Sequence, residues 1–155
     1  MQIEIERKFL VQDDGYKAQA VESHHIRQGY IAHDSGRSVR VRIRDGQGIL
    51  TVKGPHLSET SRPEWEKELS LQEAEELFLL CKPGAVEKTR WLVPAGKRFF
   101  EVDEFHGENE GLVLAEIELG SEDEAFERPS WLGAEVTGDK RYYNSHLARN
   151  PFKSW

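Results

Sequence analysis

Ile3-Glu4-Ile5-Glu6-Arg7-Lys8 is the stretch of sequence that decides the fold. Its side chains alternate with the period of a β-strand, in which successive residues point to opposite faces. The odd-numbered positions are mainly apolar, whereas the even-numbered positions hold two glutamates and a lysine. The pattern therefore predicts a strand over residues 3–11 with one apolar face and one densely charged face.

The same alternation returns in six later runs, over residues 38–44, 49–53, 64–69, 86–93, 99–103 and 112–119. For one strand alone, a solvated outer face is the simplest interpretation. Here, however, acids and bases are segregated by strand, and like charges two residues apart repel one another unless counter-charges or ligands compensate. The residues on the charged faces are Glu4, Glu6, Lys8, Arg40, Arg42, Arg44, Lys53, Glu64, Glu66, Glu68, Lys88, Arg90, Glu101, Asp103, Glu116 and Glu118.

Three segments carry helical signals. Ser70-Leu71-Gln72-Glu73 has the form of a capping box, and the helix that it opens is expected to end before Pro83. Ser121-Glu122-Asp123-Glu124 has the same form, with Pro129 as the expected end of that helix. A last helix is expected over residues 139–148. Helices of this kind can cover the apolar faces of the strands, so the sequence predicts a sheet that closes into a barrel with charges inside.

Length and composition limit the class of protein. The 155 residues suit a single domain, 1–155, with no linker or internal repeat. The net charge of −7 argues against a nucleic-acid surface. A single cysteine, Cys81, excludes an intramolecular disulfide and a cysteine metal cluster. Neither a signal peptide nor an apolar run of membrane-spanning length is visible, so a cytoplasmic protein without a membrane or nucleic-acid partner is expected.

The two kinds of charge indicate a chemistry. Arginine and lysine side chains that face one cavity match a polyanion such as a polyphosphate chain. Carboxylates without cysteine or paired histidine suit the hard cations Mg²⁺ or Mn²⁺. Together they indicate metal-assisted phosphoryl transfer. The sequence has no Walker-type glycine loop, and its six histidines fall mostly in expected loops, which argues against a serine hydrolase.

The ordered charges resemble those of the CYTH superfamily of triphosphate tunnel metalloenzymes, in particular its small bacterial members. The resemblance covers residues 3 to about 143. The matching elements, in order, are Glu4-x-Glu6-x-Lys8, Arg42-x-Arg44, Lys53, Glu64-x-Glu66, Lys88-x-Arg90 and Glu116-x-Glu118. It implies an α+β protein built on a closed eight-stranded antiparallel β-barrel, a tunnel with a charged lumen, with helices packed outside.

The resemblance also implies roles for individual residues. It implies catalytic roles for Glu4, Glu6, Lys8, Glu64 and Glu66, the last two orienting water or a second metal. It implies metal ligands Glu4, Glu6, Glu116 and Glu118, and substrate contacts from Lys8, Arg42, Arg44, Lys53, Lys88, Arg90, Tyr30, Lys140 and Arg141. Strand parity adds Asp103 to the metal ligands and Arg40 to the substrate contacts. Three positions stay open by parity: Arg40, Glu68 and Glu101 lie either in the tunnel or at its rim. Of Glu101 and Asp103, the second is expected to face the metals.

The activity implied is hydrolysis of inorganic tripolyphosphate with Mg²⁺ or Mn²⁺. Two alternatives remain within the superfamily, a class IV-type adenylyl cyclase and a nucleoside or thiamine triphosphatase. Trp65 and Trp91 have the parity opposite to the charges, which argues against a nucleobase stack inside the tunnel. A non-catalytic binder of polyphosphate is a further alternative, although such a protein gains nothing from carboxylates that face its ligand. A homodimer is left open.

Overall fold

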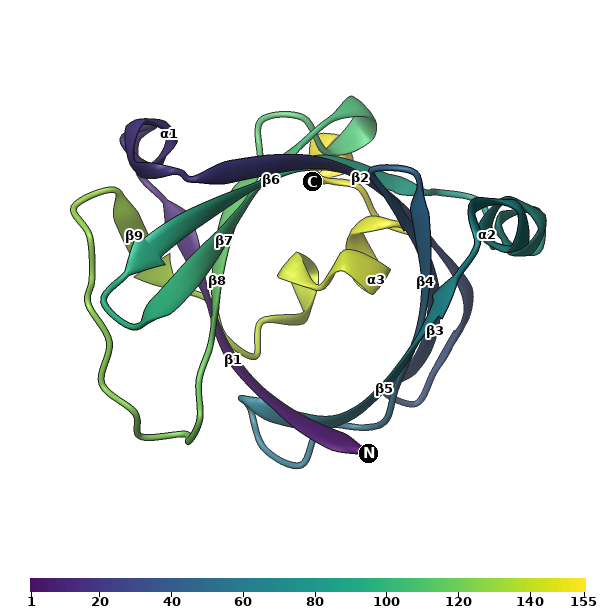
Figure 1. Ribbon diagram of the computed structural model, residues 1–155, viewed down its shortest axis with the longest axis horizontal. Coiled ribbons are helices and arrows are strands. Elements are labelled where there is room, and N and C mark those ends of the chain that lie inside the picture. Colours follow the sequence, from purple (N-terminus) through teal and green to yellow (C-terminus); the bar gives the residue numbers. More distant parts are fainter.

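The computed structural model describes residues 1–155 and shows a closed antiparallel β-barrel (Figure 1). The hydrogen-bonded order is β5-β4-β3-β2-β6-β7-β8-β1, and a further pairing of β5 with β1 closes the ring of eight strands. The ninth strand adds to the outer end of β1. The strands are β1 (Gln2–Val11), β2 (Glu22–Asp34), β3 (Arg37–Arg44), β4 (Gln47–Lys53), β5 (Ser61–Leu69), β6 (Val86–Ala95), β7 (Arg98–Phe105), β8 (Val113–Glu118) and β9 (Leu132–Glu135). The predicted barrel is thus confirmed.

Strand β1 closes the barrel because its two halves pair with different strands. Its first half pairs with β5, where Glu4 lies opposite Arg62. Its second half pairs with β8, where Lys8 lies opposite Glu116. Alternation then directs the even-numbered side chains of β1 into the lumen, while Arg7 points outward and pairs with Glu135. The charged face that the sequence predicts is therefore an inner face.

The main hydrophobic core lies on the outer side of the barrel wall. Phe9, Phe100 and Trp131 are fully or almost fully buried there, and the Phe100 and Trp131 rings meet edge to face at a centroid distance of 5.3 Å. Helix α1 (Tyr16–Gln19) adds Tyr16 to this cluster, and β9 adds Leu132. The barrel wall is polar on its inner face and apolar on its outer face, which is the reverse of a β-sandwich. The segments that cover the outer face bury its apolar side chains and so stabilise the barrel.

Helix α2 (Leu71–Phe78) also lies outside the barrel, beside β3 and β4 (Figure 1). Its predicted capping box is present: the Ser70 hydroxyl accepts from the Glu73 amide, and the Glu73 carboxylate accepts from the Ser70 amide. Gly48 allows the close approach of α2 to β4, because a Cβ at that position would lie 2.5 Å from Ala74 Cβ. None of the helices is both long and apolar enough to cross a bilayer.

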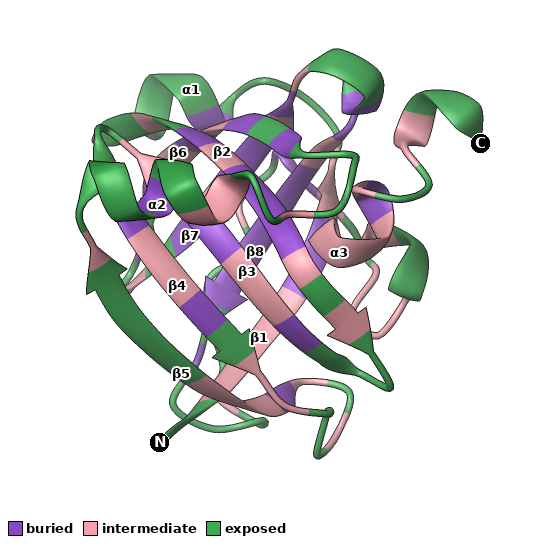
Figure 2. Ribbon diagram, turned by 90° about the vertical axis from the view of Figure 1, so that its right-hand side faces the viewer, coloured by how far each residue is buried: buried purple, intermediate pink, exposed green.

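Helix α3 (Asn144–Leu147) differs, because it lies within the outline of the barrel (Figure 1). The inner face turns apolar at this end, where Val86, Phe105 and Leu114 surround Leu147. Two residues nearer the middle of each of these strands, the inner residues are charged: Lys88, Asp103 and Glu116. The C-terminal segment therefore closes off one end of the charged lumen, and the burial colouring of Figure 2 shows buried residues on the strands behind it.

Some predicted elements are wrong. No helix follows Ser121: the Glu124 carboxylate instead accepts from the Gly120 amide and from Arg98, so this segment forms turns. The helix expected over residues 139–148 is broken into a 3₁₀ turn, Lys140–Tyr142, and the short α3, because Tyr143 between them is extended. The 13-residue strand β2 was not predicted, and it contains three of the six histidines that were expected in loops: His24, His25 and His33.

Candidate active site

The lumen of the barrel holds a polar cavity of about 290 Å³. It contains fourteen of the side chains predicted for the site: Glu4, Glu6, Lys8, Tyr30, Arg40, Arg42, Arg44, Lys53, Glu64, Glu66, Lys88, Arg90, Glu116 and Glu118. These residues come from seven strands and are separated by up to 114 positions in the sequence. Strand parity places them on the inner face, and closure of the barrel brings them together.

Acids and bases occupy different arcs of the barrel wall. The adjacent strands β8, β1 and β5 carry six glutamates into the lumen, two from each strand. The arc of β4, β3 and β6 carries the arginines at 40, 42, 44 and 90 with Lys53 and Lys88. A ligand in the lumen therefore meets mainly carboxylates on one side and mainly cations on the other, with Lys8 of β1 and Arg62 of β5 as the cations of the acidic arc.

The acidic arc holds pairs of carboxyl groups at hydrogen-bond distance. Glu6 hydrogen-bonds to Glu116, and Glu4 to Glu64. Burial and the neighbouring Glu116 and Glu4 raise the pKa of Glu6 well above its usual range. Burial also opposes ionisation of Glu116, but Lys8 and the hydrogen bond from Glu6 outweigh it and lower the pKa of Glu116. The pKa of one buried carboxyl group is thus raised beside another whose pKa is lowered, and a cation placed between the two would relieve the cost of ionising both.

Lysine side chains bridge the two arcs. Lys53 Nζ lies 2.8 Å from Glu4 Oε1 and 3.4 Å from Glu64 Oε2. Burial opposes the charge on Lys53, yet Glu6 and Glu4 overcome this effect and raise its pKa. Lys8 Nζ lies 3.8 Å from Glu116 Oε1 and donates to the Tyr142 carbonyl oxygen at 2.9 Å. Both ammonium groups are therefore held at the edge of the carboxylate pairs.

The arginines of β3 form the centre of the basic arc. Arg42 Nε donates to Gln28 Oε1 at 3.0 Å, and no carboxylate lies within ion-pair distance of Arg42 or Arg44. Burial, with Arg40 and Arg90 nearby, lowers the pKa of Arg42 to about 9. This guanidinium remains charged at neutral pH, and a bound phosphate oxygen would offset both its burial and the repulsion from Arg40 and Arg90. Arg40 Nε is buried without a hydrogen-bond partner, which is a second unmet demand for an acceptor.

Asp103 differs from the other predicted metal ligands. It does not line the cavity, because its carboxylate is enclosed between Lys88 at 2.8 Å and Arg90 at 2.8 Å. Burial opposes its ionisation, but Arg90 and Lys88 lower the pKa of Asp103 to about 2. Glu101, expected to be the less central of the two, lines the cavity instead and pairs with Arg90 at 3.0 Å. Asp103 therefore orients the two cations from behind.

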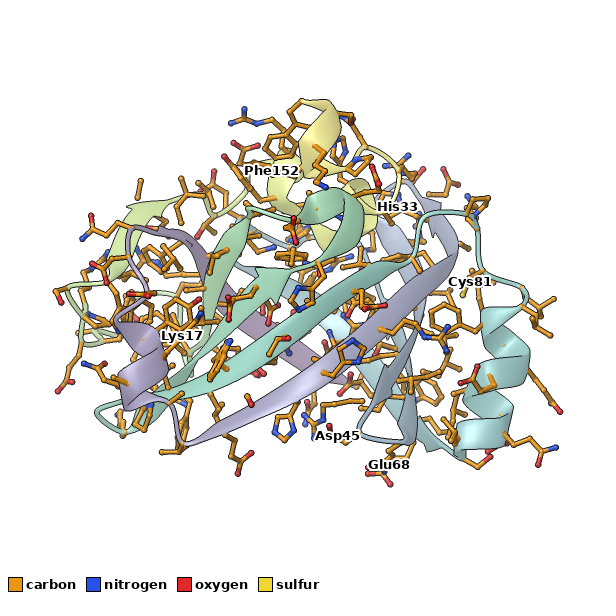
Figure 3. All side chains as sticks on the ribbon, turned by 90° about the horizontal axis from the view of Figure 1, so that it is seen from above. Lys17, His33, Asp45, Glu68, Cys81 and Phe152 are labelled. Atoms are coloured by element: carbon orange, nitrogen blue, oxygen red, sulfur yellow. The ribbon has the colours of Figure 1, made fainter.

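Three further predicted positions lie outside the tunnel. Arg141 is exposed and pairs with Asp139 at 2.7 Å, and Lys140 lines a neighbouring cavity. Glu68 does not line the tunnel either; it lies at the end of the barrel opposite to the C-terminal segment (Figure 3). Arg40, by contrast, is in the cavity wall, which answers the question of rim or tunnel for that residue.

The sequence interpretation missed several lining residues. Arg62 has the parity of Glu64 and Glu66, but it lies outside the strand expected over residues 64–69, since β5 begins three residues earlier, at Ser61. Asn144 of α3 accepts from Lys88 Nζ at 2.8 Å and from Gln28 Nε2 at 3.1 Å. No local sequence pattern predicts that Asn144 lines the lumen, because its position depends on where the C-terminal segment folds back.

The donor set can be tested against the divalent metal that the resemblance implies. As they stand, no three His, Cys, Asp or Glu side chains converge closely enough to hold a metal ion by themselves. Mg²⁺, however, is commonly bound by one or two carboxylates together with substrate phosphates and water. The carboxyl pair Glu6–Glu116 fits that mode, since both groups offer hard oxygen ligands and the pair lacks a full counter-charge.

The charge balance of the lumen also favours a divalent metal that binds together with the substrate. Eight glutamates and eight lysines or arginines line the cavity, so its formal charge is zero with neutral histidine. A linear triphosphate would bring several negative charges into a buried space, which is costly unless cations accompany it. The wall is therefore suited to a polyanion that arrives with divalent cations.

An antiparallel barrel whose lumen opposes an acidic arc to a basic arc defines a tunnel for polyanions. The chain belongs to the CYTH domain family, which it matches over residues 2–145. An inorganic triphosphatase of Acetivibrio thermocellus is 49% identical over 153 residues, covering 98% of this chain and 97% of that protein. An inorganic triphosphatase of Nitrosomonas europaea is 41% identical over 154 residues, with 94% and 96% covered. A crystal structure of an inorganic triphosphatase superimposes with a TM-score of 0.65 at 37% identity, over 94% of this chain and 97% of that one.

Proposed function

We propose that this protein is an inorganic triphosphatase that hydrolyses a phosphoanhydride bond of tripolyphosphate with Mg²⁺ or Mn²⁺. The observation that carries the proposal is the opposition of two charged arcs inside one closed barrel, with the cavity formally neutral. Relatives that carry the name inorganic triphosphatase match almost the whole chain. The metal-dependent character follows the family, and the choice of Mg²⁺ or Mn²⁺ rests on the all-oxygen donor set.

The basic arc binds and orients the substrate in this proposal. Arg42 and Arg44, which have no carboxylate partner, donate hydrogen bonds to phosphate oxygens in bidentate fashion. Lys88 contributes a point charge at the buried end, where Asn144 and Asp103 fix its ammonium group. Because these groups come from rigid strands, the chain of phosphates is held extended along the lumen.

The acidic arc holds the cation and orients water. Glu4, Glu6, Glu116 and Glu118 would hold the metal, which when bound neutralises the charge that develops on the phosphoryl oxygens. Glu64 and Glu66 lie on the adjacent strand, and the Glu66 carboxylate accepts from Thr51 at 2.8 Å. These two residues orient the attacking water in line with the leaving phosphate.

The experiment is a substrate panel with purified protein and Mg²⁺ or Mn²⁺. Tripolyphosphate, ATP and thiamine triphosphate are supplied separately, and released phosphate and cyclic AMP are measured. We expect metal-dependent phosphate release, fastest from tripolyphosphate, because the cavity wall offers few apolar side chains for a base or thiazolium ring. Cyclic AMP from ATP without phosphate from tripolyphosphate would replace this function with a cyclase, and tight binding without turnover would replace it with a binding protein.

A further inference from the structure

A second cavity, of about 390 Å³, lies beside the tunnel at the end closed by the C-terminal segment. Its wall is formed by His33, Ser35, Gly36, His56, Arg62, Lys140, Tyr143, Ser145, His146 and Arg149. Four of these residues, His56, Arg62, Tyr143 and Ser145, also line the tunnel. The two spaces are thus neighbours with a shared wall, and Figure 3 shows His33 next to the C-terminal segment.

The second cavity is positively charged and uncompensated. Its wall contains no aspartate or glutamate, although the whole chain has a net charge of −7. Arg62, Lys140 and Arg149 take part in none of the ion pairs of the structure. Arg62 donates only to the carbonyl oxygens of Gly54 and Gly36, at 3.1 and 2.8 Å. Three unpaired cations around one hollow indicate an anionic ligand.

Two histidines in the wall of the second cavity, His33 and His56, lie close to the same cations. Burial, followed by Arg62 and Lys53, lowers the pKa of His56 to about 4. Burial, followed by Arg149 and Arg62, also lowers the pKa of His33. The ring of His56 stacks on Tyr143 at a centroid distance of 5.4 Å, so this pair forms part of the shared wall. An anion in the second cavity would reduce the repulsion that all these groups experience.

We propose that the second cavity binds the phosphate groups of a linear polyphosphate that extend beyond the three held in the tunnel. This inference rests on the proposed function, because it takes the tunnel as the site of the terminal triphosphate. The four residues that both cavities share give the polyphosphate chain a continuous path from one cavity to the other. Lys140, which the resemblance marked as a substrate contact, lies in this cavity and not in the tunnel.

The test compares affinities for a long-chain polyphosphate, tripolyphosphate and ATP, measured by calorimetry with Mg²⁺ in a Glu6→Gln background that suppresses turnover. Arg149→Glu reverses one charge of the second cavity and leaves the tunnel wall intact, since Arg149 does not line it. Lys97→Glu is the matched control, because Lys97 is an exposed residue in the turn between β6 and β7. We expect Arg149→Glu to weaken long-chain polyphosphate about tenfold and tripolyphosphate less than about twofold.

Three results would overturn the inference. In the first, Arg149→Glu weakens long-chain polyphosphate no more than Lys97→Glu does. In the second, it weakens both polyphosphates equally, which would make Arg149 a part of long-range attraction to the tunnel. In the third, it weakens ATP more than polyphosphate, which would assign the cavity to a nucleoside. Failure of the proposed function is distinguishable, because it would appear as absent turnover of tripolyphosphate by the unmodified protein.

Discussion

At the scale of single residues, the carboxyl pair formed by Glu6 and Glu116 carries a large electrostatic cost in the metal-free site. Two buried acids in contact cannot both be ionised without cost, and here burial, Glu116 and Glu4 raise the pKa of Glu6 well above its ordinary value. A divalent cation bound by the two carboxylates would remove that cost. Function and metal-free stability are therefore opposed at this position.

Glu6→Gln is expected to stabilise the metal-free protein by about 1 kcal/mol, because the amide keeps a hydrogen bond to Glu116 without a second negative charge. Urea unfolding in EDTA measures this difference. Addition of saturating Mg²⁺ should then stabilise the unmodified protein by about 2 to 3 kcal/mol and the variant by much less. A variant that is less stable in EDTA, or equally stabilised by Mg²⁺, would remove Glu6 from the metal site.

His56 provides a pH-dependent test at the same scale. Its pKa is about 4 in the folded protein, below the ordinary value of 6.5. Between these values the unfolded chain binds more protons than the folded one, so stability rises with pH through this window and is lost as pH falls from 6.5 to 4. His56→Gln cannot titrate and should show a flatter dependence. The check is the melting temperature of both proteins from pH 4 to 7, where parallel curves would contradict the assignment.

At the scale of elements, local sequence signals succeeded where local interactions decide the structure. The capping box at Ser70 opens α2 as predicted, since its hydrogen bonds lie within four residues. The identical signal at Ser121 failed, because Glu124 is taken by Arg98, which is 26 positions away. Strand β2 escaped prediction because its inward residues Gln28 and Tyr30 are uncharged and its histidines suggested a loop.

The contact between α2 and β4 gives a prediction on packing. Gly48→Ala would place a Cβ 2.5 Å from Ala74 Cβ, so it is expected to destabilise the protein by about 1 to 3 kcal/mol. Since residue 48 faces away from the lumen, turnover of tripolyphosphate should persist. The double variant Gly48→Ala with Ala74→Gly restores the space and should cost less than the sum of the two single changes. Strict additivity in urea unfolding would show that the helix does not press on this strand.

At the scale of the whole molecule, the two-residue period of charged side chains predicts most of the architecture. It predicted the barrel and fourteen of the residues that line the lumen. It could not predict Asn144, whose place depends on the C-terminal segment entering the barrel. It also misjudged Asp103, because parity tells which face a side chain takes but not whether neighbouring cations enclose it.

The central claim is that the inner face of the barrel acts on the triphosphate and the outer face does not. Lys8 and Arg7 are adjacent cations on β1 that point to opposite sides, Lys8 into the tunnel and Arg7 toward Glu135. The most direct measurement is kcat/KM for tripolyphosphate with Mg²⁺ in Lys8→Gln and Arg7→Gln. We expect a loss of about 10- to 100-fold for Lys8→Gln and less than about twofold for Arg7→Gln. Equal losses in two folded variants, or a larger loss for Arg7→Gln, would contradict the account.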